Sequence, residues 1–114
     1  MIETTYLSEE LVVGTSVLKS TFEGIDEIQY LQISPRTSIR KHHHENQWEV
    51  WICFSTKSVY VCLKGEDHEL INNTDKQMVI IAIKGHHNYS YDDLTLPFHW
   101  WGFSLNHGSM VVND

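Results

Sequence analysis

The chain has few basic residues and few cysteines. The first shortage argues against nucleic acid and anionic membrane partners, and the second against a disulfide-stabilised fold. Eight Lys and Arg residues stand against 15 Asp and Glu, which gives a formal charge of −7. Because an acidic surface repels phosphate groups, we expect no nucleic acid partner and no binding to an anionic membrane surface. The two cysteines, Cys53 and Cys62, lie in apolar segments, and we expect both to be free buried thiols rather than a disulfide.

The chain also lacks long hydrophobic runs and a recognisable targeting segment. Its first residues, MIETTYLSEE, have no basic start followed by an apolar run, as a signal peptide would. No stretch approaches the roughly 18 apolar residues that a membrane span needs. We therefore expect a cytoplasmic protein. No linker, repeat or low-complexity tract interrupts the 114 residues, which predicts a single domain over residues 1–114.

Many short apolar runs, rich in Val, Ile, Tyr, Phe and Trp and separated by polar turns, are typical of an all-β sandwich or barrel. No window keeps a helical period over a full helix length, apart from a short helical turn around Ser8–Leu11. A small β domain must close its sheet edges, which favours a closed barrel or jelly roll. The expected strands are Leu11–Leu18, Glu27–Ser34, Trp48–Ser55, Ser58–Leu63, Glu66–Asn72, Met78–Ile83 and Phe98–Leu105, with Asn88–Tyr91 as a further candidate.

The informative segment is the histidine run at positions 42–44, which lies inside the chain and is therefore not an expression tag. His42 and His44 point to the same face of a strand because side chains alternate. Glu49 would face the other way on an uninterrupted strand, but a turn at 45–47 lets it begin a neighbouring strand and return to the same interior. Two imidazoles and one carboxylate suit a divalent first-row metal such as Fe, Mn, Ni or Zn.

The pattern His42-x-His44-x-x-x-x-Glu49, followed by an apolar strand, resembles the first motif of the cupin superfamily. The resemblance implies a single cupin domain, a double-stranded β-helix or jelly-roll barrel, with a metal held by these three residues and by a histidine from a second motif. The run Ile80–Lys84, then Gly85 and two histidines, resembles that second motif. This second resemblance implies that His87 is the fourth ligand, with His86 as the alternative.

The second motif departs from the family pattern at two places. The family usually has a proline before its glycine, where this chain has Ile83, and a histidine three residues after the glycine, where this chain has Asn88. The first motif also resembles the nucleotide-sugar 3,4-ketoisomerases, which are cupins that transfer protons through paired histidines without a metal. Those enzymes often have Gln at the position of Glu49, so a carboxylate there favours metal binding.

Three functions follow from these resemblances. The first is a metal-dependent enzyme of the oxygenase, decarboxylase or isomerase type that acts on a small polar or carbohydrate-like molecule. The second is a metal-free sugar isomerase or epimerase, in which His42 or His44 moves a proton beside a carbonyl. The third is a small-ligand-binding protein without turnover, because fold alone does not separate binding from catalysis.

Further residues are candidates for the walls of the site. Arg40 shares a face with the paired histidines in a regular strand and is placed to meet a substrate carboxylate or phosphate; the alternative is a surface charge. His99, in the last expected strand, is a candidate proton donor, against the alternative of an ordinary strand histidine. Trp51 shares a face with Glu49 and is expected to line the cavity. Tyr60 and His86 complete the expected substrate pocket.

The remaining histidines have no expected role in chemistry. His43 should point away from its two neighbours, His68 should be solvated after a turn, and His107 lies near the end of the chain. The strand from Trp48 is apolar on both faces, so its outer face needs a cover, either another part of the fold or a partner subunit. This is the ground for expecting a homodimer.

Overall fold

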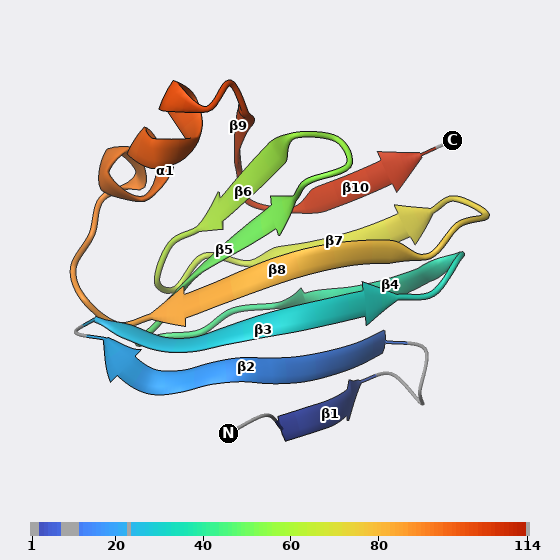
Figure 1. Ribbon diagram of the computed structural model, residues 1–114, viewed down its shortest axis with the longest axis horizontal. Coiled ribbons are helices and arrows are strands. Elements are labelled where there is room, and N and C mark those ends of the chain that lie inside the picture. The colour runs from blue at the N-terminus through green and yellow to red at the C-terminus, as the bar shows by residue number, and fades with distance from the viewer. Residues whose placement is uncertain (1–2, 8–11, 23, 114) are drawn as a thin grey trace.

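The computed structural model describes residues 3–7, 12–22 and 24–113, with side chains described from Gly24 onward. Within these ranges the chain forms ten strands and one helix (Figure 1). In chain order the elements are β1 (Glu3–Leu7), β2 (Val12–Phe22), β3 (Ile25–Ile33), β4 (Thr37–His42), β5 (Trp48–Cys53), β6 (Ser58–Cys62), β7 (His68–Asn73), β8 (Met78–Gly85), α1 (Tyr91–Trp100), β9 (Ser104–His107) and β10 (Met110–Asn113).

The strands form two mixed sheets. The larger sheet has the order β1-β2-β3-β8-β5-β6-β9, and the smaller has the order β10-β7-β4. Neighbouring strands are antiparallel except for β6 with β9 and β7 with β10. The strands of the smaller sheet run behind those of the larger one in Figure 1. The all-β class is confirmed, but the described strands form two separate sheets, so the expected closed barrel is not what this part of the chain shows.

The main core lies between the two sheets. Strand β3 contributes Leu31 and Ile33, β5 contributes Trp51, and the smaller sheet contributes Leu70 and Met110; all five side chains are buried. Both cysteines are free and buried, as expected from the sequence. Every second side chain of β7 is buried, which is the alternation of a strand with one face on a core.

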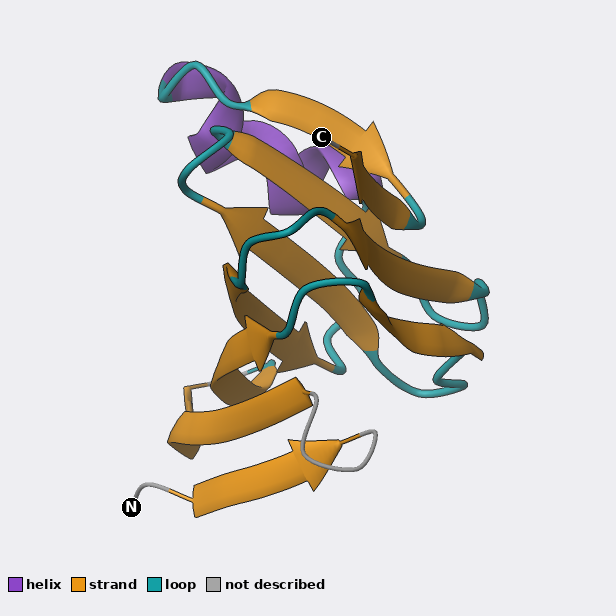
Figure 2. Ribbon diagram, turned by 90° about the vertical axis from the view of Figure 1, so that its right-hand side faces the viewer, coloured by secondary structure: helices purple, strands orange, loops and turns teal. Residues whose placement is uncertain are grey.

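A second core covers the outer face of the larger sheet. Trp48, Val50 and Ile52 of β5 pack there with Phe98 of helix α1. Helix α1 lies at one end of the molecule and β1 at the other (Figures 1 and 2). All six residues of β5 are therefore buried within one chain. Helix α1 covers the outer apolar face of β5, which the sequence analysis expected another part of the fold or a partner subunit to cover. This strand therefore gives no reason to expect a homodimer.

The expected strand Asn88–Tyr91 is the loop before helix α1 and the first residue of that helix, and the expected strand Phe98–Leu105 is mostly the end of the helix and the turn after it; only its last two residues fall in strand β9. Ser90 caps the helix in a capping box with Asp93. The helix ends at Trp100, and Gly102 just beyond it has a φ of 75°, the left-handed conformation that closes a Schellman motif. Among the described residues, no helix is long and apolar enough to cross a membrane. The expected helical turn at Ser8–Leu11 lies outside the described residues.

The Ser90 cap should contribute measurably to stability because the Ser90 hydroxyl accepts the N–H of Asp93 at 3.1 Å. We expect Ser90→Ala to lower the free energy of unfolding by about 1 kcal/mol, since an N-cap alanine leaves that N–H without its acceptor. Urea unfolding followed by circular dichroism measures this. Ser38→Ala, at an exposed position of β4, is the control and should change the value by less than about 0.5 kcal/mol. Equal effects from the two variants would contradict the assignment.

Candidate metal centre

Four side chains that could ligate a metal meet between the two sheets. They are His42, the last residue of β4; His44, in the following loop; Glu49 of β5; and His68, the first residue of β7. Each offers one ligand atom, and these atoms all lie within 4.8 Å of one another. His42 and His68 are register partners across the β4–β7 ladder, while Glu49 faces them from the larger sheet. The centre therefore joins both sheets.

The centre is compact and mostly buried. Glu49 is 4% exposed and His68 is 1% exposed, while His42 and His44 are half-buried. The ring centroids of His42 and His68 lie 4.4 Å apart, and those of His42 and His44 lie 5.0 Å apart. The Oε1 atom of Glu49 lies 3.2 Å from Nε2 of His68 and 3.8 Å from Nε2 of His44. His42 and His44 form the less buried side of the centre, although the Nε2 atom of His44 is itself buried.

Backbone carbonyls orient two of the imidazoles. The Nδ1 atom of His42 lies 2.7 Å from the carbonyl oxygen of Arg40, and that of His68 lies 3.1 Å from the carbonyl oxygen of Glu66. A carbonyl oxygen only accepts, so each Nδ1 carries the proton and donates it. Each Nε2 then has a free lone pair, which is how a metal-binding histidine is usually held.

Three buried atoms of the centre have no hydrogen-bond partner: Nε2 of His44, Oε1 of Glu49 and Nε2 of His68. A buried polar atom without a partner costs about 1–3 kcal/mol, so such atoms in a folded protein need a physical explanation. At 3.2 Å the lone pair of His68 Nε2 faces a carboxylate oxygen, which is repulsive while the imidazole is neutral. A cation bound between these atoms would give each of the three a partner.

Electrostatics keep the ligands in the form that binds metal. Burial alone would raise the pKa of Glu49, but a hydrogen bond and positive charge from His68 when that imidazole is protonated, the charge of Lys84 and a hydrogen bond from Trp51 hold that pKa below its ordinary value. Burial lowers the pKa of His44; the charge of Glu49 opposes that effect, and the charge of Lys84 adds to it. Since a metal needs a neutral imidazole and an ionised carboxylate, both shifts favour binding at neutral pH.

The donor set fits a divalent first-row metal. Imidazole and carboxylate ligands are shared by Fe, Mn, Ni and Zn sites. Each ligand atom would lie about 2.1 Å from such an ion, and the four atoms, all within 4.8 Å of one another, are grouped closely enough to approach it together. Cys62, opposite Glu49 on β6, is not part of the set: its Sγ donates to the carbonyl of Gly108, and burial raises its pKa.

The structure does not bring His87 or His86 into this group. Strand β8 ends at Gly85, and the backbone N–H of His86 then bonds to the carbonyl of Gly24, outside the space between the sheets. The His87 ring is exposed and packs against Tyr89 at 4.6 Å, and Nδ1 of His86 lies 2.7 Å from a carboxylate oxygen of Asp26. His68 occupies the position that the sequence analysis gave to His87.

The other candidates lie at varied distances from the centre. Trp51 is beside it, with its ring edge-on to His68 at 5.3 Å, and Tyr60 is opposite Trp51 on β6, half-buried against the inner core. Arg40 is exposed, and its carbonyl oxygen orients His42. His99 is on the exposed side of α1, not in a strand facing the cavity, so its expected position is wrong.

His68 is the residue that sequence reasoning missed, since it was expected to be solvated. The signal was present: His68 comes three residues after Gly65, which is the spacing expected of the second motif and is absent after Gly85. A second signal is alternation, because His68 shares the buried face of β7 with Leu70. A buried histidine at the start of a strand needs a polar partner, and the centre supplies one.

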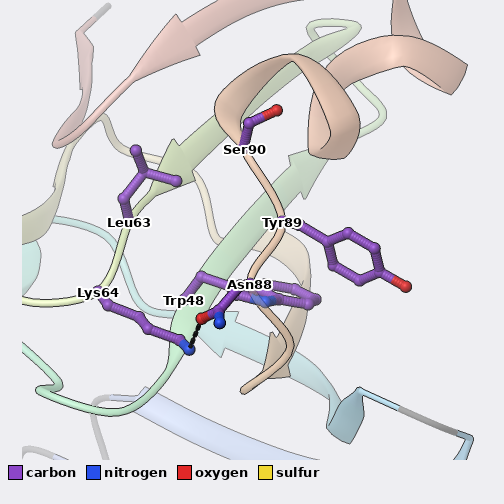
Figure 3. A pocket seen from close by; sticks show the side chains of 6 residues that line it. All are labelled: Trp48, Leu63, Lys64, Asn88, Tyr89 and Ser90. Atoms are coloured by element: carbon purple, nitrogen blue, oxygen red, sulfur yellow. Dashed lines mark hydrogen bonds between the residues drawn. The ribbon is translucent and has the colours of Figure 1, made fainter.

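A separate pocket of about 320 Å³ lies by the start of α1 (Figure 3). Its polar groups satisfy one another: the Lys64 ammonium donates to Asn88 Oδ1 at 2.8 Å, and the Trp48 indole donates to the carbonyl of His87 at 2.9 Å. None of its lining residues has a buried polar atom without a partner. The lining residues are Trp48, Leu63, Lys64, Asn88, Tyr89 and Ser90.

Comparison with known proteins gives a fold but no family. No protein-family model matches the chain, and no curated protein matches it. A solved structure of the plu4264 protein from Photorhabdus luminescens is similar, with a TM-score of 0.54 over 85% of this chain and 89% of that chain. The two sequences are 14% identical, so the similarity is one of fold alone.

Proposed function

We propose that this protein is a cupin-type metal-binding protein that holds one divalent first-row ion through His42, His44, Glu49 and His68, and that a small polar molecule binds at that ion. The observation that carries the proposal is the set of three buried ligand atoms without partners. A chance cluster of surface histidines would be solvated, whereas here the carboxylate and one imidazole are almost fully buried. The fixed tautomers of His42 and His68 support it independently.

The protein's own residues give the centre its properties. When bound, the ion would supply a positive charge that polarises a carbonyl or other oxygen of the small molecule. Glu49 balances part of that charge, and the inner core around Trp51 excludes water from one side. The less buried side of the centre, formed by His42 and His44, is where the small molecule would approach. Chemistry of the oxygenase, decarboxylase or isomerase type is the catalytic form of this proposal.

Metal analysis tests the proposal directly. Protein purified without a metal-affinity column should contain close to one equivalent of a first-row metal, measured by elemental analysis. After chelation, adding Mn, Fe, Ni or Zn at about 100 times its dissociation constant should stabilise the fold by about 2.7 kcal/mol. For a domain of this size that is a rise in melting temperature of roughly 10 °C.

The same measurements distinguish the proposed metal-binding protein from a metal-free sugar isomerase. A metal-free sugar isomerase would contain less than a tenth of an equivalent of metal, would show no melting shift with any of the four metals, and would be stabilised by nucleotide-linked sugars. That pattern would overturn the proposal. Glu49→Gln adds a second contrast, since it should remove metal uptake here and have little effect in an enzyme that relies on the paired histidines alone.

A further inference from the structure

The loop between β6 and β7, residues 63–67, crosses from the larger sheet to the smaller one and ends directly before His68. Its backbone contacts two of the four proposed ligands. The N–H of Gly65 donates to the carbonyl oxygen of His44 at 2.8 Å, and the carbonyl oxygen of Glu66 accepts the Nδ1 proton of His68 at 3.1 Å. The same loop therefore helps to hold both the backbone of His44 and the ring of His68.

The side chain of Glu66 closes this loop on itself. Its Oε1 atom accepts the backbone N–H of Leu63 at 2.8 Å, and the backbone N–H of Glu66 donates to the carbonyl oxygen of Leu63 at 3.1 Å. These two hydrogen bonds join the first residue of the loop to its fourth. Because they restrict the backbone of Glu66, they also restrict the direction of the carbonyl that orients His68.

The chain around the β9–β10 connection supports the loop from outside. Nε2 of His107 donates to Oε1 of Glu66 at 2.6 Å, since a carboxylate oxygen only accepts. Two residues later the hydroxyl of Ser109 accepts the N–H of Glu69, the residue after His68, at 3.0 Å. The His107 ring also packs against that of Tyr91 in α1, with centroids 5.2 Å apart. Glu66 thus connects the C-terminal part of the described chain to a proposed metal ligand.

His43 attaches the same loop to the segment that carries the other two histidine ligands. Its exposed ring lies between two carboxylates, with Nδ1 3.0 Å from Asp67 Oδ1 and Nε2 2.8 Å from Glu45 Oε1. It is not one of the four residues whose ligand atoms are grouped at the centre. The loop is therefore joined to this segment by a side-chain pair as well as by the hydrogen bond from Gly65 to His44.

We propose that the β6–β7 loop fixes the metal-binding geometry of His44 and His68, and that Glu66 and His107 are positioning residues of the centre. This inference rests on the proposed metal-binding function. Neither residue belongs to the group of four, so each would act through the residues that it holds. A loop held in place leaves less conformational freedom to be lost when the metal binds. Removing groups that orient metal ligands typically weakens metal affinity by roughly 10–100-fold.

Substitutions in the loop and on β9 test this by titration of the metal-free proteins with Co²⁺ against a competing metal indicator. Glu66→Ala should weaken Co²⁺ binding by about 10–100-fold, and His107→Ala by about tenfold. Glu66→Gln keeps an oxygen that accepts the N–H of Leu63, so it should stay within about threefold of the unaltered protein. His86→Ala is the matched control: this exposed histidine also pairs with a carboxylate, at 2.7 Å, but its partner is Asp26 of β3.

The absorption spectrum of bound Co²⁺ separates positioning from a general effect on stability. A residue that only stabilises the fold would change the melting temperature of the metal-free protein, but not the affinity or the spectrum measured while the protein is folded. Positioning instead predicts altered d–d bands in Glu66→Ala and His107→Ala and unaltered bands in His86→Ala. All spectra are recorded well below the melting temperature of each metal-free variant, determined by circular dichroism.

The other outcomes each overturn a stated part. Unchanged affinity and spectrum in Glu66→Ala overturn this inference and leave the proposed function standing. Equal effects of His107→Ala and His86→Ala overturn the role of His107. A Glu66→Gln variant as weak as Glu66→Ala overturns the hydrogen-bonded loop as the cause and assigns the effect to the charge of Glu66. Unaltered protein that binds no metal overturns the proposed function together with this inference. If Glu66→Ala does not fold, His107→Ala, at an exposed position, decides the test.

Discussion

Replacing His68 with alanine is expected to abolish metal uptake, while replacing His87 with alanine leaves it unchanged. His68 provides one of four donors, and its Nε2 lies 3.2 Å from the carboxylate of Glu49 in a fully buried position. Changes to groups that merely orient a metal ligand cost roughly 10–100-fold in affinity, so removing a ligand should cost about 100-fold or more. Titration with a competing metal indicator measures the affinity.

His87 is the matched control because the sequence alone favoured it as the fourth ligand. Its side chain is exposed and packs against Tyr89, away from the centre. Circular dichroism and melting of the metal-free variants separate loss of metal from loss of fold. If His87→Ala lost the metal and His68→Ala kept it, the arrangement of β7 beside β4 would be wrong, and with it the centre described here.

The contrast between these two histidines shows which parts of the site can be read from sequence. His42, His44 and Glu49 were found because strand alternation and one turn, all within eight residues, determine their relative positions. His68 joins them only through the pairing of β4 with β7, which is a long-range contact that local patterns do not specify. The two histidines after Gly85 matched the expected motif in composition, whereas His68, at the expected spacing after Gly65, was predicted to be solvated.

For the fold, as for the site, the features set by local sequence were predicted and those set by long-range pairing were not. The strands β3, β5, β6, β7 and β8 were expected close to their observed bounds, because runs of branched and aromatic residues alternate with polar turns, while β2 was expected to end at Leu18 and continues to Phe22. Helix α1 was missed because it is only ten residues long and contains Pro97, so no helical period is sustained. Its signal was the capping box at Ser90. The parallel pairing of β6 with β9 joins segments far apart in the chain, and no local pattern specifies it.

Gly85→Ala is expected to lower the free energy of unfolding by about 3 kcal/mol or more, because there is no room for a side chain. A Cβ at this position would collide with the carbonyl oxygen of Gly24 and with the ring of Trp48. Neither neighbour is free to move. The Gly24 carbonyl accepts a hydrogen bond from the N–H of His86, and the buried indole of Trp48 donates to the carbonyl of His87.

Gly102→Ala is the control for this substitution. Gly102 has a φ of 75° with nothing within 4 Å of an added Cβ. Its alanine variant should therefore lower the free energy of unfolding by only about 1 kcal/mol, through backbone strain alone. Urea unfolding of the metal-free proteins gives both values. Equal losses in the two variants would mean that β3, β8 and β5 pack more loosely at this end than the contacts of Gly85 imply.

Metal affinity should fall in Gly85→Ala but not in Gly102→Ala, for a reason that connects packing to the centre. Gly85 is the register partner of Trp48, and Glu49 is the next residue of the same strand. A side chain that displaces Trp48 therefore shifts the carboxylate that faces His68. The histidines after Gly85 suggested that this glycine forms a turn for a metal ligand. Its position indicates a different role, in which close packing of β8 on β5 holds Glu49 in place.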